Sequence, residues 1–135
     1  MSIFESLGIA GTGVTVYRKW MDAVSDNIAN LNTVRPTSQS AFQARYIVAS
    51  SIEGGDSGEG AQVAGVAYGS ATGRLVYDPS NPLADKKGYV RYPDIDLSSQ
   101  MTQLIMAQRG YQANLAVIDR AKDAYTAALQ LGRDA

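Results

Sequence analysis

Apolar positions recur every three or four residues at both ends of this chain. Between residues 3 and 31 the steps alternate four and three without a break, a 3.5-residue rhythm that keeps one stripe of a helix facing a partner helix. This stripe comprises Ile3, Leu7, Ala10, Val14, Tyr17, Met21, Val24, Ile28 and Leu31. As one helix, the segment would be about 43 Å long at roughly 1.5 Å per residue. The pattern therefore predicts a long N-terminal helix that packs against a second one.

The same rhythm returns near the C-terminus. It runs through Leu97, Met101, Leu104, Gln108, Tyr111, Leu115, Ile118, Lys122, Tyr125 and Leu129. Asp96 is expected to cap the start of this helix, because a carboxylate there accepts from free backbone N–H groups. Gly132 is expected to end it. Two matched segments at the two ends predict a mainly α fold, in which long terminal helices pair as a coiled-coil-like hairpin around a small β-rich or irregular insertion.

Each helix also carries a second apolar line away from this stripe. On the first helix it comprises Ile9, Val16, Trp20 and Ala23. On the second it comprises Met106, Gly110, Ala113, Val117, Ala121, Ala124, Ala128 and Leu131. A helix in an isolated hairpin buries one stripe and solvates the rest. Ordinary alanine-rich helix surface would explain part of this pattern, but opposed lines on both helices favour burial on several sides, hence assembly into a larger helical object.

The period changes between the helices. Residues 42–48 alternate approximately every two positions, which predicts a strand, and residues 62–68 and 74–77 are two further short strand candidates. Glycine-rich residues 51–60 predict a mobile loop, and residues 85–88 predict a hairpin tip before a strand at 89–92. The expected organisation is residues 1–33 as the N-terminal helix, 34–93 as the inserted segment and 94–135 as the C-terminal helix.

Asparagines cluster where the first helix should end. Asn27 and Asn30 are three residues apart and so share a face, while Asn32 could adopt the left-handed conformation that stops a helix. They could simply be solvated polar residues. Their place beside an unbroken apolar stripe favours a role in fixing register, like that of a buried asparagine in a coiled coil.

Composition narrows the function classes. The chain has 135 residues, 12 lysines and arginines against 13 aspartates and glutamates, and neither histidine nor cysteine. This balance does not suggest a nucleic-acid surface, and the missing residue types remove the commonest general base and the usual zinc sites. Asp94 and Asp96 form an isolated D-x-D, for which a turn and helix capping are sufficient explanations. We therefore expect no enzyme activity, cofactor or bound metal. We also expect neither a cleaved signal peptide nor membrane insertion.

Several separate motifs resemble bacterial flagellar basal-body rod proteins, most closely those of the proximal rod. They are Ser25–Thr33 (SDNIANLNT), Asn81–Asp85 (NPLAD), Gly88–Val90 (GYV) and Gln108–Asn114 (QRGYQAN). The resemblance implies a structural subunit that leaves the cytoplasm by flagellar type III export. It also implies a rod in which paired terminal helices form an inner tube around the export channel and transmit motor torque. A cytoplasmic coiled-coil adaptor or scaffold is the alternative that the heptads alone would allow.

The resemblance also implies partners and a location. The partners would be copies of this chain and other rod subunits, with the MS ring and export gate at the base and the distal rod above, in the basal body outside the cytoplasmic membrane. The expected helix-pairing seam comprises Leu7, Val14, Tyr17, Met21, Val24, Ile28, Leu31, Leu97, Met101, Leu104, Tyr111, Leu115, Ile118, Tyr125 and Leu129. The expected inter-subunit or register residues are Trp20, Asn27, Asn30, Asn32, Gln108, Arg109, Asn114 and Val117.

Overall fold

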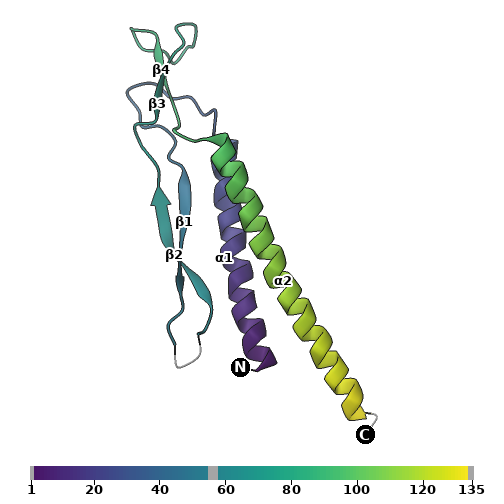
Figure 1. Ribbon diagram of the computed structural model, residues 1–135. Coiled ribbons are helices and arrows are strands. Elements are labelled where there is room, and N and C mark those ends of the chain that lie inside the picture. The colour runs from purple at the N-terminus through teal and green to yellow at the C-terminus, as the bar shows by residue number, and fades with distance from the viewer. Residues whose placement is uncertain (1, 55–57, 134–135) are drawn as a thin grey trace.

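The computed structural model describes residues 2–54 and 58–133. Two long helices form the ends of the chain, and a small β-rich insertion lies between them in the sequence. The elements are α1 (Ile3–Ala29), β1 (Arg45–Ser51), β2 (Ala61–Tyr68), β3 (Arg74–Tyr77), β4 (Tyr89–Tyr92) and α2 (Leu97–Arg133). Figure 1 shows α2 along one side of α1 and the β1–β2 hairpin along another. Helix α1 contacts α2, β1 and β2. The predicted arrangement of terminal helices around a small β insertion is confirmed.

Local hydrogen bonds define the start and end of α1. Ser2 and Glu5 form a reciprocal capping box, in which each side chain accepts from the other residue's backbone N–H. The helix ends at Ala29 and Asn30 is its C-cap. The left-handed stop expected at Asn32 is wrong, because no non-glycine residue in the described part of the chain has a positive φ.

The start of α2 agrees with the sequence, but its end does not. The Ser99 backbone N–H donates to Asp96 Oδ2 at 2.7 Å, so Asp96 caps the helix as predicted. Gly132 does not end it, since α2 continues to Arg133. A glycine costs an exposed helix about 1 kcal/mol but does not force it to stop.

The insertion contains two separate antiparallel ribbons. β1 pairs with β2 from Arg45↔Tyr68 to Ser51↔Ala61, with an irregularity between Val48 and Ala49, and β3 pairs with β4. All four strands lie close to the predicted segments. Of the predicted loop at 51–60, residue 51 belongs to β1 and residues 55–57 lie outside the described part of the chain.

The buried core is thin and consists mostly of small side chains. Its apolar members are Ala10, Val16, Ala23, Val24, Ala41, Ala44, Val90, Ile95 and Ala107. Many larger apolar side chains remain exposed, most of all Leu131 at 74% and Phe4 at 68%. Because monomeric proteins rarely leave contiguous apolar surface open, this distribution points to surfaces that other molecules cover.

Candidate functional site

The helix pair is held by aromatic side chains of α1 that pack on small or polar residues of α2. Tyr17 lies against Gly110 so closely that a Cβ there would clash with its ring. Trp20 stacks on Tyr17 with ring centroids 6.0 Å apart, and its Nε1 donates to Gln103 Oε1 at 3.3 Å. The Tyr17 ring of α1 fills the space that the absent side chain of Gly110 leaves on α2, and this lets the two backbones approach.

A buried polar junction joins both helices to the hairpin. Asn27 Nδ2 donates to the Arg45 carbonyl and to Gln100 Oε1, both at 2.9 Å, and Asn27 Oδ1 accepts from the Arg45 backbone N–H at 2.8 Å. Asn27 is 0% exposed and Gln100 is 2% exposed. The Arg45 guanidinium also pairs with Asp26 at 2.9 Å on the surface. One amide side chain thus connects α1, β1 and α2 at a defined relative position.

Most of the predicted seam on α1 lies next to other parts of the chain. Val24 is buried, and the six other predicted seam residues of this helix are partly buried: Leu7, Val14, Tyr17, Met21, Ile28 and Leu31. The second apolar line of α1 finds a partner within the chain, since Val16 and Ala23 are buried and Val16 lies beneath the β1–β2 hairpin.

The predicted seam on α2 is mostly open. Leu104, Tyr111 and Ile118 are partly buried, whereas five others are exposed: Leu97, Met101, Leu115, Tyr125 and Leu129. The line that faces α1 includes Gln100, Gln103, Ala107, Gly110 and Asn114. It lies roughly 75° around the helix from the predicted line at 3.6 residues per turn. The physical reason is steric, because the Tyr17 ring occupies the space that a side chain at position 110 would need.

The predicted register and inter-subunit residues fall into two groups. Asn27 makes its contacts inside the chain. Trp20, Asn30 and Asn114 are partly buried, and Gly13 packs against the Asn114 side chain. The exposed group comprises Asn32, Gln108, Arg109 and Val117. The exposed group is therefore the more accessible of the two to another molecule.

Sequence reasoning missed Gln100, Gln103 and Ala107 as contacts to α1. A signal was present, because residues 100, 103, 107, 110 and 114 also repeat every three or four positions. The side chains of this line are polar or small, so the parallel line of leucines and tyrosines is the stronger apolar pattern.

The described residues offer no candidate metal site. No group of three or more acidic residues gathers within residues 2–54 and 58–133 in a way that could hold a metal ion. Nor is any helix in this part of the chain long and apolar enough to cross a membrane. The feature that the described residues present to a binding partner is the exposed apolar surface of the helices.

Comparison with known proteins assigns the chain to a family. Residues 86–131 match the model described as flagellar basal body rod FlgEFG protein C-terminal. The flagellar basal-body rod protein FlgC of Escherichia coli O6:H1 is 33% identical over 135 residues, covering 98% of this chain and all of the relative. FlgC of Salmonella typhimurium is 32% identical and FlgC of Bacillus subtilis 30%, each with 98% of this chain and all of the relative covered.

The chain belongs to the FlgC family of flagellar basal-body rod proteins. FlgC proteins are structural subunits of the rod and not enzymes, and they are part of the flagellar basal body. Membership implies assembly with other rod components, and an adaptor in the cytoplasm is not favoured. Two of the motifs coincide with contacts between the helices. Asn27 of the polar junction lies in SDNIANLNT, and Gly110 and Asn114, which lie against Tyr17 and Gly13, belong to QRGYQAN.

Proposed function

We propose that this FlgC chain builds the proximal rod through the exposed apolar faces of its terminal helices. In this proposal α1 and α2 form a coiled-coil-like hairpin, and neighbouring hairpins pack into a tube around the export channel. Axial and lateral helix contacts carry motor torque to the distal rod. The observation that supports it is the exposed apolar surface on both sides of the α2 line that faces α1.

Two stripes make up that surface. The acidic stripe comprises Leu97, Met101, Ile105, Leu115, Asp119 and Asp123. The basic stripe comprises Met106, Ala113, Val117, Arg109 and Arg120. With 3.6 residues per turn, the members of each stripe fall within about 80° of one another, and the centres of the two stripes lie about 120° apart around α2. All eleven residues are exposed.

The energetics favour covering these stripes. Burying a large aliphatic side chain contributes about 1.5–3 kcal/mol relative to leaving it in water. A chain with a thin core of mainly small residues therefore gains stability from each neighbour that packs on α2. A specific interface needs roughly 1,000 Å² or more of buried surface, and a helix of 37 residues with two apolar sides is long enough to supply it.

The proposal assigns roles to the parts of the chain. Residues 1–33 and 94–135 form the rod core, and residues 34–93 pack outside it. The exposed register residues Asn32, Gln108, Arg109 and Val117 contact neighbours, while Asn27 sets the register within each subunit. The neighbours are copies of this chain and other rod subunits, with the MS ring and export gate below and the distal rod above, after type III export across the cytoplasmic membrane.

Complementation of a motile bacterium that lacks its own FlgC chain tests this proposal. The wild-type chain should restore swimming and appear in isolated basal bodies. Val117→Asp places a charge on the basic stripe at a side chain that is 47% exposed. The variant should therefore fold as judged by circular dichroism, but it should neither restore swimming nor appear in basal bodies. Val117→Leu, which keeps the same position apolar, is the matched control and should do both. Normal swimming of the deletion strain, or recovery of the chain only from the cytoplasm, would contradict the proposal.

A further inference from the structure

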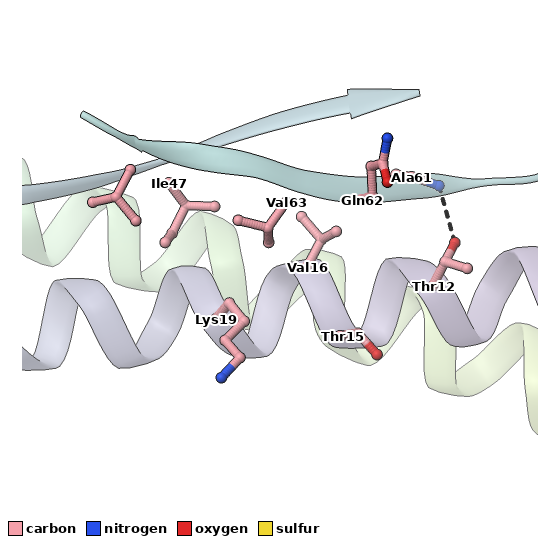
Figure 2. Close-up of a pocket in the computed structure, with 9 residues that line it drawn as sticks. Thr12, Thr15, Val16, Lys19, Ile47, Ala61, Gln62 and Val63 are labelled. Atoms are coloured by element: carbon pink, nitrogen blue, oxygen red, sulfur yellow. Dashed lines mark hydrogen bonds between the residues drawn. The ribbon is translucent and has the colours of Figure 1, made fainter. Parts of the chain in front are cut away.

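The β1–β2 hairpin is attached to α1 at two separate points. At one end Asn27 bonds both backbone groups of Arg45, and at the other the Ala61 backbone N–H donates to Thr12 Oγ1 at 3.0 Å (Figure 2). Thr12 and Asn27 are about 22 Å apart along α1 at 1.5 Å per residue. Arg45 and Ser51, which pairs with Ala61, are about 20 Å apart along β1 at 3.3 Å per residue. The matching lengths let the hairpin lie along the helix.

A close backbone approach keeps the Thr12 attachment tight. Gly60 has a φ of 109°, in the left-handed region that glycine adopts without strain, and a Cβ there would collide with Thr12 Oγ1. The same hydroxyl donates to the Ile9 carbonyl at 2.7 Å, so both its donor and acceptor functions are used. The attachment is therefore a defined contact between the hairpin and the helix.

Between the two attachments the hairpin and α1 leave an open groove. It has a volume of about 390 Å³, and Figure 2 shows Val16, Ile47 and Val63 projecting into the space between the strands and the helix. Val66 also lines it and is 42% exposed. Among the described lining residues the charged one is Lys19, whose ammonium group points outward from the rim. The groove is thus apolar with a positive edge.

The chain's own second helix does not cover this groove. α2 and the hairpin each pack on α1, but α2 does not pack on β1 or β2 in the part of the chain that the structure describes, and Figure 1 shows them on different sides of α1. Any helix in the groove therefore comes from another molecule.

Charge distinguishes the two exposed stripes of α2 as occupants. The acidic stripe carries Asp119 and Asp123, with Lys122 at its edge, whereas the basic stripe carries Arg109 and Arg120. Opposite charges across an interface favour a partner, and like charges exclude it. Lys19 at the rim therefore selects the acidic stripe and disfavours the basic one.

We propose that the groove between α1 and the β1–β2 hairpin receives the acidic stripe of α2 from a second copy of this chain. Leu115 enters among the groove valines and Asp119 faces Lys19. The spacing agrees on both sides, since Lys19 follows Val16, and Asp119 follows Leu115, by about one helical turn. Groove and stripe are different surfaces, so the contact is head-to-tail and repeats along a helical assembly instead of closing into a dimer. This inference rests on the proposed rod function.

Disulfide cross-linking in assembled basal bodies tests the pairing, and the chain has no cysteine of its own to interfere. The double variant Val63→Cys with Leu115→Cys should give disulfide-linked products of twice the subunit mass and higher multiples after oxidation, because each chain then carries one cysteine on each side of the repeating contact. The matched control combines Val63→Cys with Val117→Cys, which lies on the opposite side of α2, and it should give none. Absence of the product from the first variant, or its formation in the second alone, would overturn the inference.

A charge exchange provides an independent readout in the same cross-linking background. Adding Lys19→Glu should cause loss of the cross-linked product, and adding Asp119→Lys to that variant should restore it. Lack of restoration, with the chain still present in basal bodies, would refute the pairing of Lys19 with Asp119. Absence of every variant and of the wild-type chain from basal bodies would instead refute the rod function, so the two failures are distinguishable.

Discussion

Replacing Asn27 by alanine should destabilise the fold more than any other single change at the end of α1. The side chain makes three hydrogen bonds of 2.8–2.9 Å that join α1 to β1 and α2, and it has no exposed surface. Each bond contributes about 1 kcal/mol net, and a buried partner left unsatisfied costs about 1–3 kcal/mol. The free energy of unfolding should therefore fall by about 3 kcal/mol.

The tryptophan at position 20 makes this loss measurable. It is the chain's only tryptophan and lies in the contact between α1 and α2, so its fluorescence reports helix pairing. At a urea dependence of about 2 kcal/mol per M, a loss of about 3 kcal/mol lowers the unfolding midpoint by about 1.5 M. Circular dichroism of the same samples checks that fluorescence and helix content change together.

Asn30→Ala is the matched control, because it removes the same side chain one helical turn later. Asn30 donates to the Asp26 carbonyl at 2.9 Å and accepts from Thr33 Oγ1 at 3.1 Å, and because Asn30 is only partly buried, water can replace these bonds. Its cost should be at most about 1 kcal/mol. Equal midpoints for Asn27→Ala and Asn30→Ala would refute the buried junction as the element that joins the three segments.

A double-mutant cycle with Gln100→Ala separates the helix–helix bond from the hairpin bonds. Both single variants remove the bond between Asn27 Nδ2 and Gln100 Oε1, so the double variant should cost less than the sum of the two. Strict additivity would show that this bond contributes nothing to pairing.

Two further predictions concern packing and pH. Gly110→Ala should cost about 1–3 kcal/mol because its Cβ would press on the Tyr17 ring, whereas Gly11→Ala meets open space and should stabilise the helix slightly, as the same urea titration will show. Hydrogen bonds from the Tyr89 and Lys87 backbone N–H groups and from the Thr37 hydroxyl lower the pKa of Asp85 below its ordinary value of 3.8. The folded carboxylate is thus favoured above the unfolded pKa, and this contribution is lost as the pH falls from about 4 through the lowered value. The protection factor of the Tyr89 amide, which corrects for the intrinsic pH dependence of exchange, should fall over that range, and Asp85→Asn should abolish the dependence.

Several features of this chain follow from its sequence alone. The unbroken three-and-four spacing placed both helices, and the capping carboxylate of Asp96 placed the start of α2. The approximate period-two run at residues 42–48 indicated β1, which begins and ends three residues later. These features are local, because each depends on residues within one or two turns of each other. The family motifs were equally readable, since they are contiguous segments.

The partner of each helix face was decided only by the tertiary structure. Several lines of α2 repeat at nearly the same interval, and periodicity does not rank them. The line with Gly110 faces α1 because the aromatic rings of Tyr17 and Trp20 need space there, which leaves the leucine line open. The attachment of the hairpin by Asn27 and Thr12 likewise depends on atoms far apart in the sequence. Steric fit and hydrogen-bond geometry between distant segments, which no local pattern encodes, selected among equally periodic faces.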